Sequence, residues 1–345
     1  MPLRALLTSH IYAAPTNRIK LDALRAAGVE LTVATADRWQ EALFNVPPSP
    51  DGNLISLPAF FAGRNNAFLY RANLRRILRQ VQPDVLHIEQ EPVSLVTAQW
   101  LWAARGLPLK ITFFTWENIA RHLPPLQRWI ESWALNQAKG CVAGNTEAAS
   151  LLRAKGFSGK IVVSPILGIK LPEGFEPSGS LMGRFTVGFV GRLVKEKGIR
   201  VLNEAARGLD VRLLAVGVGP EQVNGEVVGG VRPEQVKSYL RQMDVLVLPS
   251  LTTPKWKEQF GRVLIEAMAC GVPVVGSGSG AIPETIGDAG LIVPEGDVAA
   301  LRAAIVRLKD DAELRAELSR RGLERVKRWS HETVARELIE LWQSI

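Results

Sequence analysis

Short apolar runs alternate with amphipathic stretches along most of the chain. In the first half, apolar runs occupy residues 3–9, 30–35, 84–89, 109–115 and 140–145, and residues 19–28 have the pattern of a helix that ends at Gly28. In the second half, such runs recur at 185–191, 211–217, 244–250 and 272–277. Buried strands separated by helices are typical of parallel sheets that are covered on both faces. The pattern therefore predicts an α/β protein.

A stretch rich in Pro and Gly, residues 166–183, interrupts this rhythm and predicts a linker. We expect an N-terminal domain at 1–165, a C-terminal domain at 184–328 and a closing segment at 329–345, with Ser330 as the N-cap of its helix. Ligands bind beyond the carboxyl ends of the strands in open parallel sheets, so the residues that follow each strand are the first candidates for a site. Two such sheets facing each other would form a central cleft.

Charge is distributed unevenly along the 345 residues, whose formal net charge is +8. Residues 1–172 contain 19 Lys or Arg and 11 Asp or Glu, whereas residues 173–345 contain 23 of each. This asymmetry predicts two units with different partners, of which the first favours an anionic surface. No run of 18 apolar residues or cleavable leader is visible, so neither a membrane span nor a signal peptide is expected. Cys141 and Cys270 lie in apolar surroundings and indicate buried free thiols in a reducing cytosol.

The segment 258–297 carries most of the candidate chemistry. Glu258 falls in a loop, and a helix begins near Phe260 to Arg262, where free backbone N–H groups form an anion site. Glu266 lies inside an apolar helical run and needs a hydrogen-bonding partner, which a ribose diol, backbone amides or an arginine can supply. A solvated loop charge is the alternative interpretation of Glu258.

Two further loops connect a strand to a helix. Arg192 and Lys197, in residues 189–198, suit a diphosphate near a helix N-terminus, although solvated charge is the alternative. The segment matches neither a P-loop nor a dinucleotide fingerprint. Glycines in residues 277–286 permit close approach to a ligand or form a tight turn. The four histidines and two cysteines show no spacing typical of metal ligands.

Taken together, GRL-x-KEKG, DVLVLPS, E-x7-E, G-x-IPE and PEGD resemble the retaining nucleotide-sugar glycosyltransferases of family 4. The resemblance covers most of residues 180–345 and implies the GT-B fold: two Rossmann-like domains with parallel sheets that face a central cleft. It implies an N-terminal acceptor-binding domain, a C-terminal donor-binding domain and a last helix that crosses back to the N-terminal domain.

The resemblance also implies the roles of individual residues. Arg192 and Lys197 would bind and stabilise the donor diphosphate, Glu258 would contact the transferred sugar, and Glu266 would hold the ribose hydroxyls. Phe260 and Gly261 would supply backbone near the sugar and phosphates, and Val231, with its neighbours in the chain, would lie near the base. A retaining, metal-independent reaction follows, with a UDP- or GDP-sugar as donor substrate and no cofactor.

The N-terminal half departs from the family pattern in two places. The loop at residues 8–18 contains no glycine pair but contributes His10 and Arg18 to the acceptor side. Phe114 stands where many relatives have a histidine near the transferred sugar. Candidate substitutes are His87, His122, Trp116, Glu117 and Asn118.

The basic excess predicts the partner of the N-terminal domain. A helix expected at 66–81 places arginines on one face, either as a solvated surface or as a contact for anionic lipid headgroups or a phosphorylated acceptor; these are Arg71, Arg75, Arg76 and Arg79. Trp129 and Trp133, one helical turn apart, belong to a core or to a membrane-facing rim. We therefore expect a cytoplasmic enzyme, peripheral at the inner face of the membrane, that transfers a hexose to a glycan, lipid-linked or small-molecule acceptor.

Four other functions are alternatives to a glycosyltransferase at the level of the sequence. A nucleotide-sugar epimerase or a phosphorylase would share the same fold. A nucleic-acid-binding protein would fit the pI of 9.7, but the balanced charge of the second half and the lack of recognisable binding motifs oppose it. A dehydrogenase is disfavoured because residues 217–222 lack the third glycine of the dinucleotide fingerprint.

Overall fold

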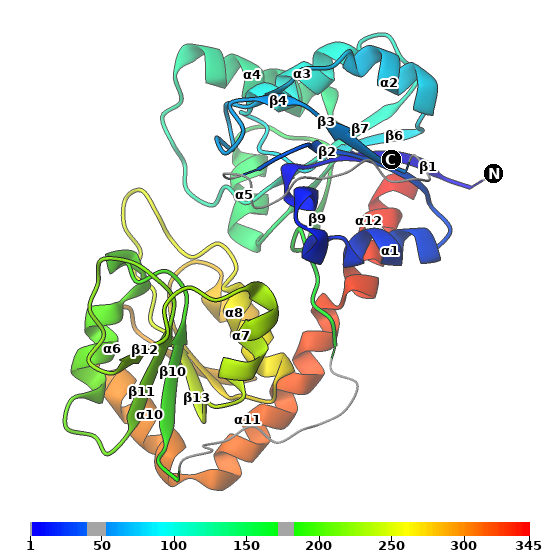
Figure 1. Ribbon diagram of the computed structural model, residues 1–345. Helices are drawn as coiled ribbons and strands as arrows, with labels where there is room; N and C mark the ends of the chain where they lie inside the picture. The colour runs from blue at the N-terminus through cyan, green and yellow to red at the C-terminus, as the bar shows by residue number, and fades with distance from the viewer. Residues whose placement is uncertain (1, 40–52, 172–182) are drawn as a thin grey trace. The chain divides into compact units, whose positions relative to one another are not determined.

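The computed structural model describes residues 2–39, 53–171 and 183–345 and divides into two compact units (Figure 1). Unit 1 comprises residues 1–168 and 331–345, and unit 2 comprises residues 169–330. The division falls within the segment expected as a linker, and residues 172–182 of that segment lie outside the described residues. Each unit is an α/β domain built on a parallel sheet.

Unit 1 contains a seven-stranded parallel sheet in the order β3-β2-β1-β6-β7-β8-β9. Its strands are β1 Arg4–Thr8, β2 Glu30–Ala36, β3 Leu54–Leu57, β6 Val85–Ile88, β7 Lys110–Thr115, β8 Gly140–Ala143 and β9 Lys160–Val163. A short antiparallel pair, β4 Ala59–Phe60 and β5 Leu69–Tyr70, stands apart from it. The chain order reverses between β1 and β6, and such a switch point is where ligands bind in open α/β sheets.

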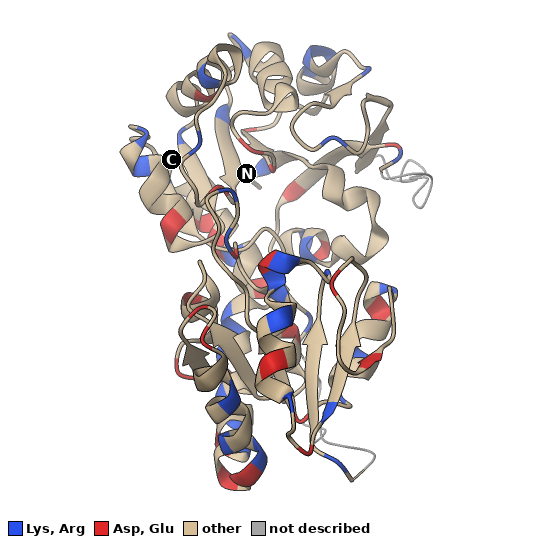
Figure 2. Cartoon of the chain, turned by 90° about the vertical axis from the view of Figure 1, so that its left-hand side faces the viewer, with Lys and Arg blue, Asp and Glu red and all other residues tan. Residues whose placement is uncertain are grey.

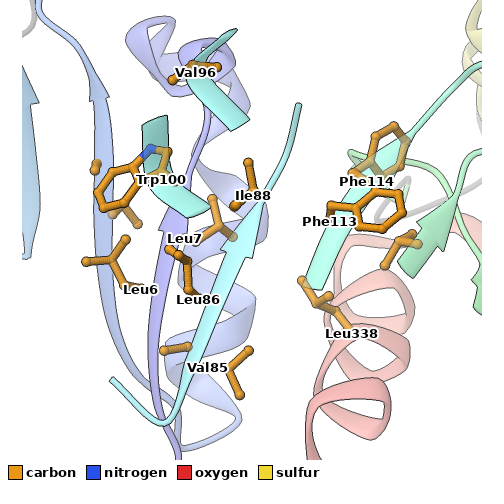
Figure 3. Packing of buried hydrophobic residues seen from close by; sticks show 14 of the residues in the cluster. Leu6, Leu7, Val85, Leu86, Ile88, Val96, Trp100, Phe113, Phe114 and Leu338 are labelled. Carbon is orange, nitrogen blue, oxygen red and sulfur yellow. The ribbon is translucent and has the colours of Figure 1, made fainter. Parts of the chain in front are cut away.

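Helices cover this sheet, and its inner strands β6 and β8 are therefore buried on both faces. They are α1 Ile19–Ala26, α2 Leu74–Val81, α3 Leu95–Ala104, α4 Pro125–Gln137, α5 Thr146–Ala154 and α12 His331–Gln343, with 3-10 turns at His10–Ala13 and Pro15–Asn17. Figure 3 shows the packing of this core, with side chains from β1, β6 and β7 beside Trp100 of α3 and Leu338 of α12. The last helix therefore completes the core of the unit that contains the N-terminus.

Unit 2 repeats the plan with a six-stranded parallel sheet in the order β12-β11-β10-β13-β14-β15. The strands are β10 Thr186–Val190, β11 Arg212–Val216, β12 Glu226–Val227, β13 Val245–Leu248, β14 Val274–Ser277 and β15 Gly290–Val293. The helices are α6 Ile199–Ala206, α7 Pro233–Leu240, α8 Arg262–Ala269, α9 Ile282–Ile286, α10 Val298–Asp310 and α11 Ala312–Arg325, with 3-10 turns at Lys195–Lys197 and Val326–Trp329. Acidic and basic residues are interspersed on its helices, in line with its balanced charge (Figure 2).

One helix predicted from the sequence is shorter than expected. The pattern over residues 66–81 predicts a continuous helix, but α2 begins at Leu74. The Asn73 side chain caps it by accepting from Arg76 N–H at 3.0 Å, while Tyr70 pairs with Ala59 in the β4–β5 ribbon. Tyr70 and Arg71 therefore precede the helix, and the predicted row of arginines is only partly helical.

Candidate functional site

The strand-to-helix loops of unit 2 meet at the carboxyl ends of β10, β13 and β14 through close backbone contacts. Gly198 lies in the left-handed region with φ +71°, and a Cβ there would lie 1.9 Å from the carbonyl oxygen of Pro249. Gly280, with φ +52°, approaches Glu258 in the same way, at 2.0 Å from its carbonyl oxygen. These glycines therefore hold neighbouring loops together. For Gly280, the close approach expected for a ligand is made to the protein's own backbone.

A buried ion pair occupies this meeting point. Lys197 Nζ lies 2.6 Å from Glu258 Oε2, and Ser250 Oγ donates to the same oxygen at 2.9 Å. The Lys197 ammonium also lies 5.0 Å from the centroid of the Trp256 ring, within the range of a cation–π contact. Glu258 is only 7% exposed, so it is not the solvated loop charge considered as the alternative. Because Lys197 follows β10 and Glu258 follows β13, the pair lies at the switch point of the sheet.

The other donor-side candidates differ in exposure. Arg192, directly after β10, is exposed, and Val231 is half-buried before α7. Phe260 is half-buried against Trp329, with ring centroids 5.9 Å apart. Gly261 is the N-cap of α8 and offers no side-chain acceptor to the first N–H groups of that helix.

Glu266 differs from the fully buried carboxylate that its apolar neighbours suggest. Its side chain is 32% exposed and accepts from Arg262 Nε at 2.8 Å, one helical turn earlier. Arg262 is the kind of partner named for Glu266 as the alternative to a ribose diol. An arginine satisfies the carboxylate in this structure, and the pair is exposed enough to exchange partners.

In unit 1, His10 lies directly after β1, at the switch point of the sheet. Its ring stacks on Trp39, with centroids 4.1 Å apart, and Nδ1 is hydrogen-bonded to Gln90, which follows β6. Burial lowers the pKa of His10 to about 4. The imidazole is therefore neutral at pH 7 and can exchange hydrogen bonds but cannot act as a cation.

The side chains of Arg18 and His87 form hydrogen bonds within unit 1. Arg18 donates from Nε to Tyr12 O at 3.0 Å and so braces the turn after β1. His87 is 1% exposed within β6, with Nδ1 2.8 Å from Thr112 Oγ1 and its ring packed edge-on against Trp342. Burial and the nearby Lys20 cation hold the pKa of His87 well below its usual value. This placement does not favour direct contact between His87 and an acceptor.

Trp116, Glu117 and Asn118 follow β7, and each is held by a neighbour. A Cβ at Gly144 would lie 1.9 Å from the Trp116 ring, which shows that the indole lies directly against this glycine. Glu117 forms an ion pair with Lys155, and Asn118 Nδ2 donates to Glu147 Oε2 at 3.3 Å. The three candidates therefore form one braced loop at the carboxyl edge of the sheet.

Several contributors to these sites are absent from the residues picked out by sequence reasoning. Ser250 ends the run DVLVLPS, and Glu91 follows the strand of residues 84–89, so the rule that sites follow strands points to both. Lys20 gave no such signal. It is 2% exposed, contacts the Glu89 carboxylate and donates to Ile166 O at 2.6 Å. A small pocket of unit 1 is lined by Lys20, Glu89 and Ile166, together with His87, Ser164 and Leu338.

The described ranges contain neither a cluster of metal ligands nor a helix that could span a membrane. Among residues 2–39, 53–171 and 183–345, no three His, Cys, Asp or Glu side chains are grouped as metal ligands. No helix in the same ranges is long and apolar enough to cross a bilayer. Cys141 and Cys270 are both buried and free, as expected from their surroundings.

Comparisons with known proteins agree with this geometry. Residues 184–311 match the family described as glycosyl transferases group 1, and residues 20–166 match the glycosyl transferase 4-like domain. A 2-deoxystreptamine glucosyltransferase of Streptomyces kanamyceticus is 30% identical over 80% of this chain and 83% of its own length. A phosphatidyl-myo-inositol mannosyltransferase of Mycobacterium leprae is 27% identical over 92% of this chain and 91% of its own.

Solved structures share the same architecture. A sucrose-phosphate synthase from Thermosynechococcus elongatus superimposes with a TM-score of 0.73 at 22% identity, over 99% of this chain and 98% of that one. Anabaena HepE in complex with UDP-glucose gives a TM-score of 0.72 at 14% identity, over 99% and 100%. At these identities the likeness defines the fold alone.

The two α/β units, each with a parallel sheet, and the relatives together define a glycosyltransferase of the GT-B fold. The chain belongs to the family 4 glycosyltransferases, as the resemblance of its sequence motifs predicts.

Proposed function

We propose that the protein is a retaining glycosyltransferase that moves a hexose from a nucleotide diphosphate sugar to an acceptor hydroxyl. The observation that carries the proposal is the Lys197–Glu258 pair, 2.6 Å apart at the switch point of unit 2. A cation and a carboxylate held side by side suit a donor that presents a diphosphate next to a sugar.

Each donor-side residue has a defined role in this proposal. Lys197 and the exposed Arg192 neutralise the diphosphate as it leaves, and the start of α8 at Gly261 offers N–H groups to the same phosphates. Glu258 accepts hydrogen bonds from sugar hydroxyls, and Glu266 exchanges Arg262 for the ribose diol. The half-buried Val231 borders the base, and the backbone of Phe260 borders the sugar.

The reaction requires positioning and charge stabilisation. The acceptor oxygen forms a bond to the anomeric carbon on the face from which the diphosphate departs, and the bond from that carbon to the phosphate oxygen breaks. The departing phosphate oxygen takes the proton of the acceptor hydroxyl, so the anomeric configuration is retained. Lys197 and Arg192 stabilise the charge that develops on the leaving group.

The donor is proposed to be a UDP- or GDP-sugar, without a cofactor or a catalytic metal. The HepE structures with UDP-glucose and the mannosyl- and glucosyltransferases among the relatives support this class of donor. Metal independence is proposed from the resemblance to family 4 and from the lack of a DxD motif in the sequence.

The acceptor is proposed to bind unit 1 at the carboxyl ends of β1, β6 and β7. The neutral ring of His10 and the half-buried Trp116 offer aromatic surfaces and hydrogen bonds there, as a sugar-like or cyclitol acceptor needs. The names of the relatives refer to a phosphatidyl-myo-inositol and to 2-deoxystreptamine, and both molecules contain a hydroxylated cyclohexane ring.

A basic face of unit 1 supports the proposal of a peripheral membrane enzyme. Between Asp51 and Asp84 the chain has five arginines and no Asp or Glu. Phe60 and Phe61 in this segment are 51% and 61% exposed, and the Arg71 guanidinium lies 4.7 Å from the Phe60 ring centroid. Exposed aromatic rings beside cations are typical of surfaces that enter the headgroup region of a bilayer.

The four predicted arginines are not equivalent in this proposal. Arg75 donates to the carbonyl oxygens of Ala103 and Arg105, at 3.0 and 2.7 Å, and so ties α2 to the end of α3. Arg76 and Arg79 are exposed on α2, and Arg71 is exposed just before it. We therefore expect Arg71, Arg76 and Arg79 to contact anionic headgroups at the inner face of the membrane, while Arg75 stabilises the fold.

Vesicle sedimentation tests this surface. The double variant Arg76→Glu and Arg79→Glu should bind vesicles rich in phosphatidylglycerol at least tenfold more weakly than the parent, because it reverses two charges near the surface. Lys139→Glu with Lys160→Glu, which reverses two exposed charges elsewhere on unit 1, is the matched control. Equal binding by both variants and the parent, or retention on DNA with no vesicle binding, contradicts this part of the proposal.

Product analysis tests the reaction itself. The protein is incubated with UDP-glucose or GDP-mannose and either 2-deoxystreptamine or phosphatidylinositol vesicles, with and without EDTA, and the anomeric configuration of the product is determined by NMR. We expect an α-glycoside that forms equally well in EDTA. A β-linked product contradicts retention, loss of activity in EDTA contradicts metal independence, and conversion of the donor sugar without acceptor identifies an epimerase instead.

A further inference from the structure

The Glu91 side chain connects the end of strand β6 in unit 1 to the loop that follows strand β7. It follows β6, and its Oε1 accepts the N–H of Trp116 at 2.8 Å while Oε2 accepts the hydroxyl of Thr115 at 2.5 Å. Thr115 Oγ1 in turn accepts the N–H of Glu117 at 3.0 Å. A single carboxylate therefore orients two successive peptide groups of the loop after β7.

The backbone of Glu91 is fixed independently of this loop. Its carbonyl oxygen accepts from Ser94 N–H and from Thr97 Oγ1, both at 3.0 Å, at the start of α3. Ser94 is also the N-cap of that helix. Helix α3 anchors the main chain of Glu91. The Glu91 carboxylate can therefore hold the peptide N–H of Trp116 in a fixed position.

We propose that Glu91 is a positioning residue for the acceptor side, which holds the Trp116–Asn118 loop in its binding conformation only while its carboxylate is ionised. The inference rests on the proposed function, because it assigns that loop to the acceptor. An ionised carboxylate accepts both hydrogen bonds, whereas a protonated one has a single full acceptor oxygen and brings a proton to face the Thr115 hydroxyl. Protonation therefore loosens the tie to the loop.

The burial of Glu91 and the groups around it place this change close to neutral pH. Burial raises the pKa of Glu91 to about 7, against the hydrogen bonds from Thr115 and Trp116 that lower it. Glu117, in the loop, raises it further and Lys155, at the end of α5, lowers it. The buried Cys141 thiol on β8 faces Glu91 as well, and burial holds the pKa of that thiol far above neutrality, so it stays uncharged.

The fluorescence of Trp116 tests the inference without any acceptor. The signal of Trp116 is the difference between the parent and a Trp116→Phe variant, measured between pH 5.5 and 8.5 together with its quenching by acrylamide. We expect a sigmoidal change with a midpoint near pH 7 in the parent and none in Glu91→Gln. Glu131→Gln is the matched control, because Glu131 contacts Lys155 at 2.6 Å but takes no part in the hydrogen bonds of Glu91, so the transition should stay in place.

Kinetics supply the functional readout. With 2-deoxystreptamine or phosphatidylinositol, whichever accepts sugar in the product analysis, Glu91→Gln should raise the acceptor KM about 3- to 10-fold, the worth of one net hydrogen bond, and change kcat less than twofold. The acceptor KM of the parent should rise below pH 7, and this rise should be absent in the variant.

The outcomes separate this inference from the proposed function. A pH transition of Trp116 that persists in Glu91→Gln overturns the inference, whatever the enzyme transfers. An acceptor KM unchanged in the variant, or a kcat that falls with it, overturns the positioning role. If no donor and acceptor pair reacts but the transition depends on Glu91 as described, the proposed function fails and the pH-dependent hold on the loop stands.

Discussion

Replacing Lys20 with methionine should destabilise unit 1 by more than any change at its surface. Lys20 and Glu89 are 2% and 1% exposed, and Lys20 also satisfies the carbonyl of Ile166. Removing one partner of a buried pair leaves an uncompensated charge and costs about 3–5 kcal/mol. A folded domain is stable by only about 5–15 kcal/mol, so Lys20→Met should remove a large share of the stability of unit 1.

The loss should depend on pH with a defined sign. Burial raises the pKa of Glu89 above 4.5, and Lys20 is the largest influence that opposes this rise. Without Lys20, the pKa of Glu89 in the folded state is higher still. An acid with a raised folded pKa stabilises the fold most below its unfolded pKa, and the stability is lost as pH rises towards the folded pKa. Lys20→Met should therefore be less damaging at pH 5 than at pH 8.

Urea unfolding followed by far-UV circular dichroism measures the effect. With a slope of about 2–3 kcal/mol per molar urea, the transition of unit 1 should move down by about 1–2 M. Lys20→Met with Glu89→Gln should recover at least about 2 kcal/mol, because no buried charge remains. Asp22→Asn, which breaks the exposed pair with Arg25, is the control and should cost below about 0.5 kcal/mol. Strictly additive losses in the double variant would refute the reasoning.

Two changes in unit 2 have matched controls within the chain. Gly198→Ala forces a Cβ against the Pro249 carbonyl at a positive φ, so we expect a loss above about 3 kcal/mol and no donor binding by calorimetry. The control is Gly208→Ala, at φ +70° with no atom within 4 Å, which causes only backbone strain and should cost about 1 kcal/mol. Equal losses of stability in the two variants would contradict the importance of the contact between Gly198 and Pro249. Lys197→Met should weaken binding of the free nucleoside diphosphate at least 100-fold, whereas the exposed Lys195→Met should not, and equal effects would contradict the assignment of the diphosphate to Lys197.

The central strands were predictable because their signal is local. Residues 185–191 and 244–250 are apolar on both faces, as a covered parallel strand requires, and they correspond to β10 and β13 within two residues at each end. The helix expected from Asn66 was not predictable at its start. Its hydrophobic spacing continues through Tyr70, but pairing with Ala59 and the cap at Asn73 override the pattern.

In the candidate site, too, the position of each residue was predictable from the local sequence, but the contacts between residues were not. The rule that ligands bind beyond strand ends points to Lys197 and Glu258 separately, because each follows a strand. Their pairing depends on β10 and β13 being neighbours, which is a property of the topology and not of either segment. Lys20 illustrates the limit most clearly: its helix has an ordinary amphipathic sequence, and its burial depends on Glu89, 69 positions further along the chain.

Isothermal titration of UDP-glucose, GDP-mannose and the free diphosphates UDP and GDP, into the protein and into its Glu258→Gln and Lys197→Met variants, tests the assignment of the donor site to unit 2. We predict that the parent binds at least one of these donors. Glu258→Gln should weaken binding of the sugar nucleotide but not of the free nucleoside diphosphate, and Lys197→Met should weaken binding of both. No binding of either donor to the parent, or equal affinities in all three proteins, would contradict the assignment of the donor site to unit 2.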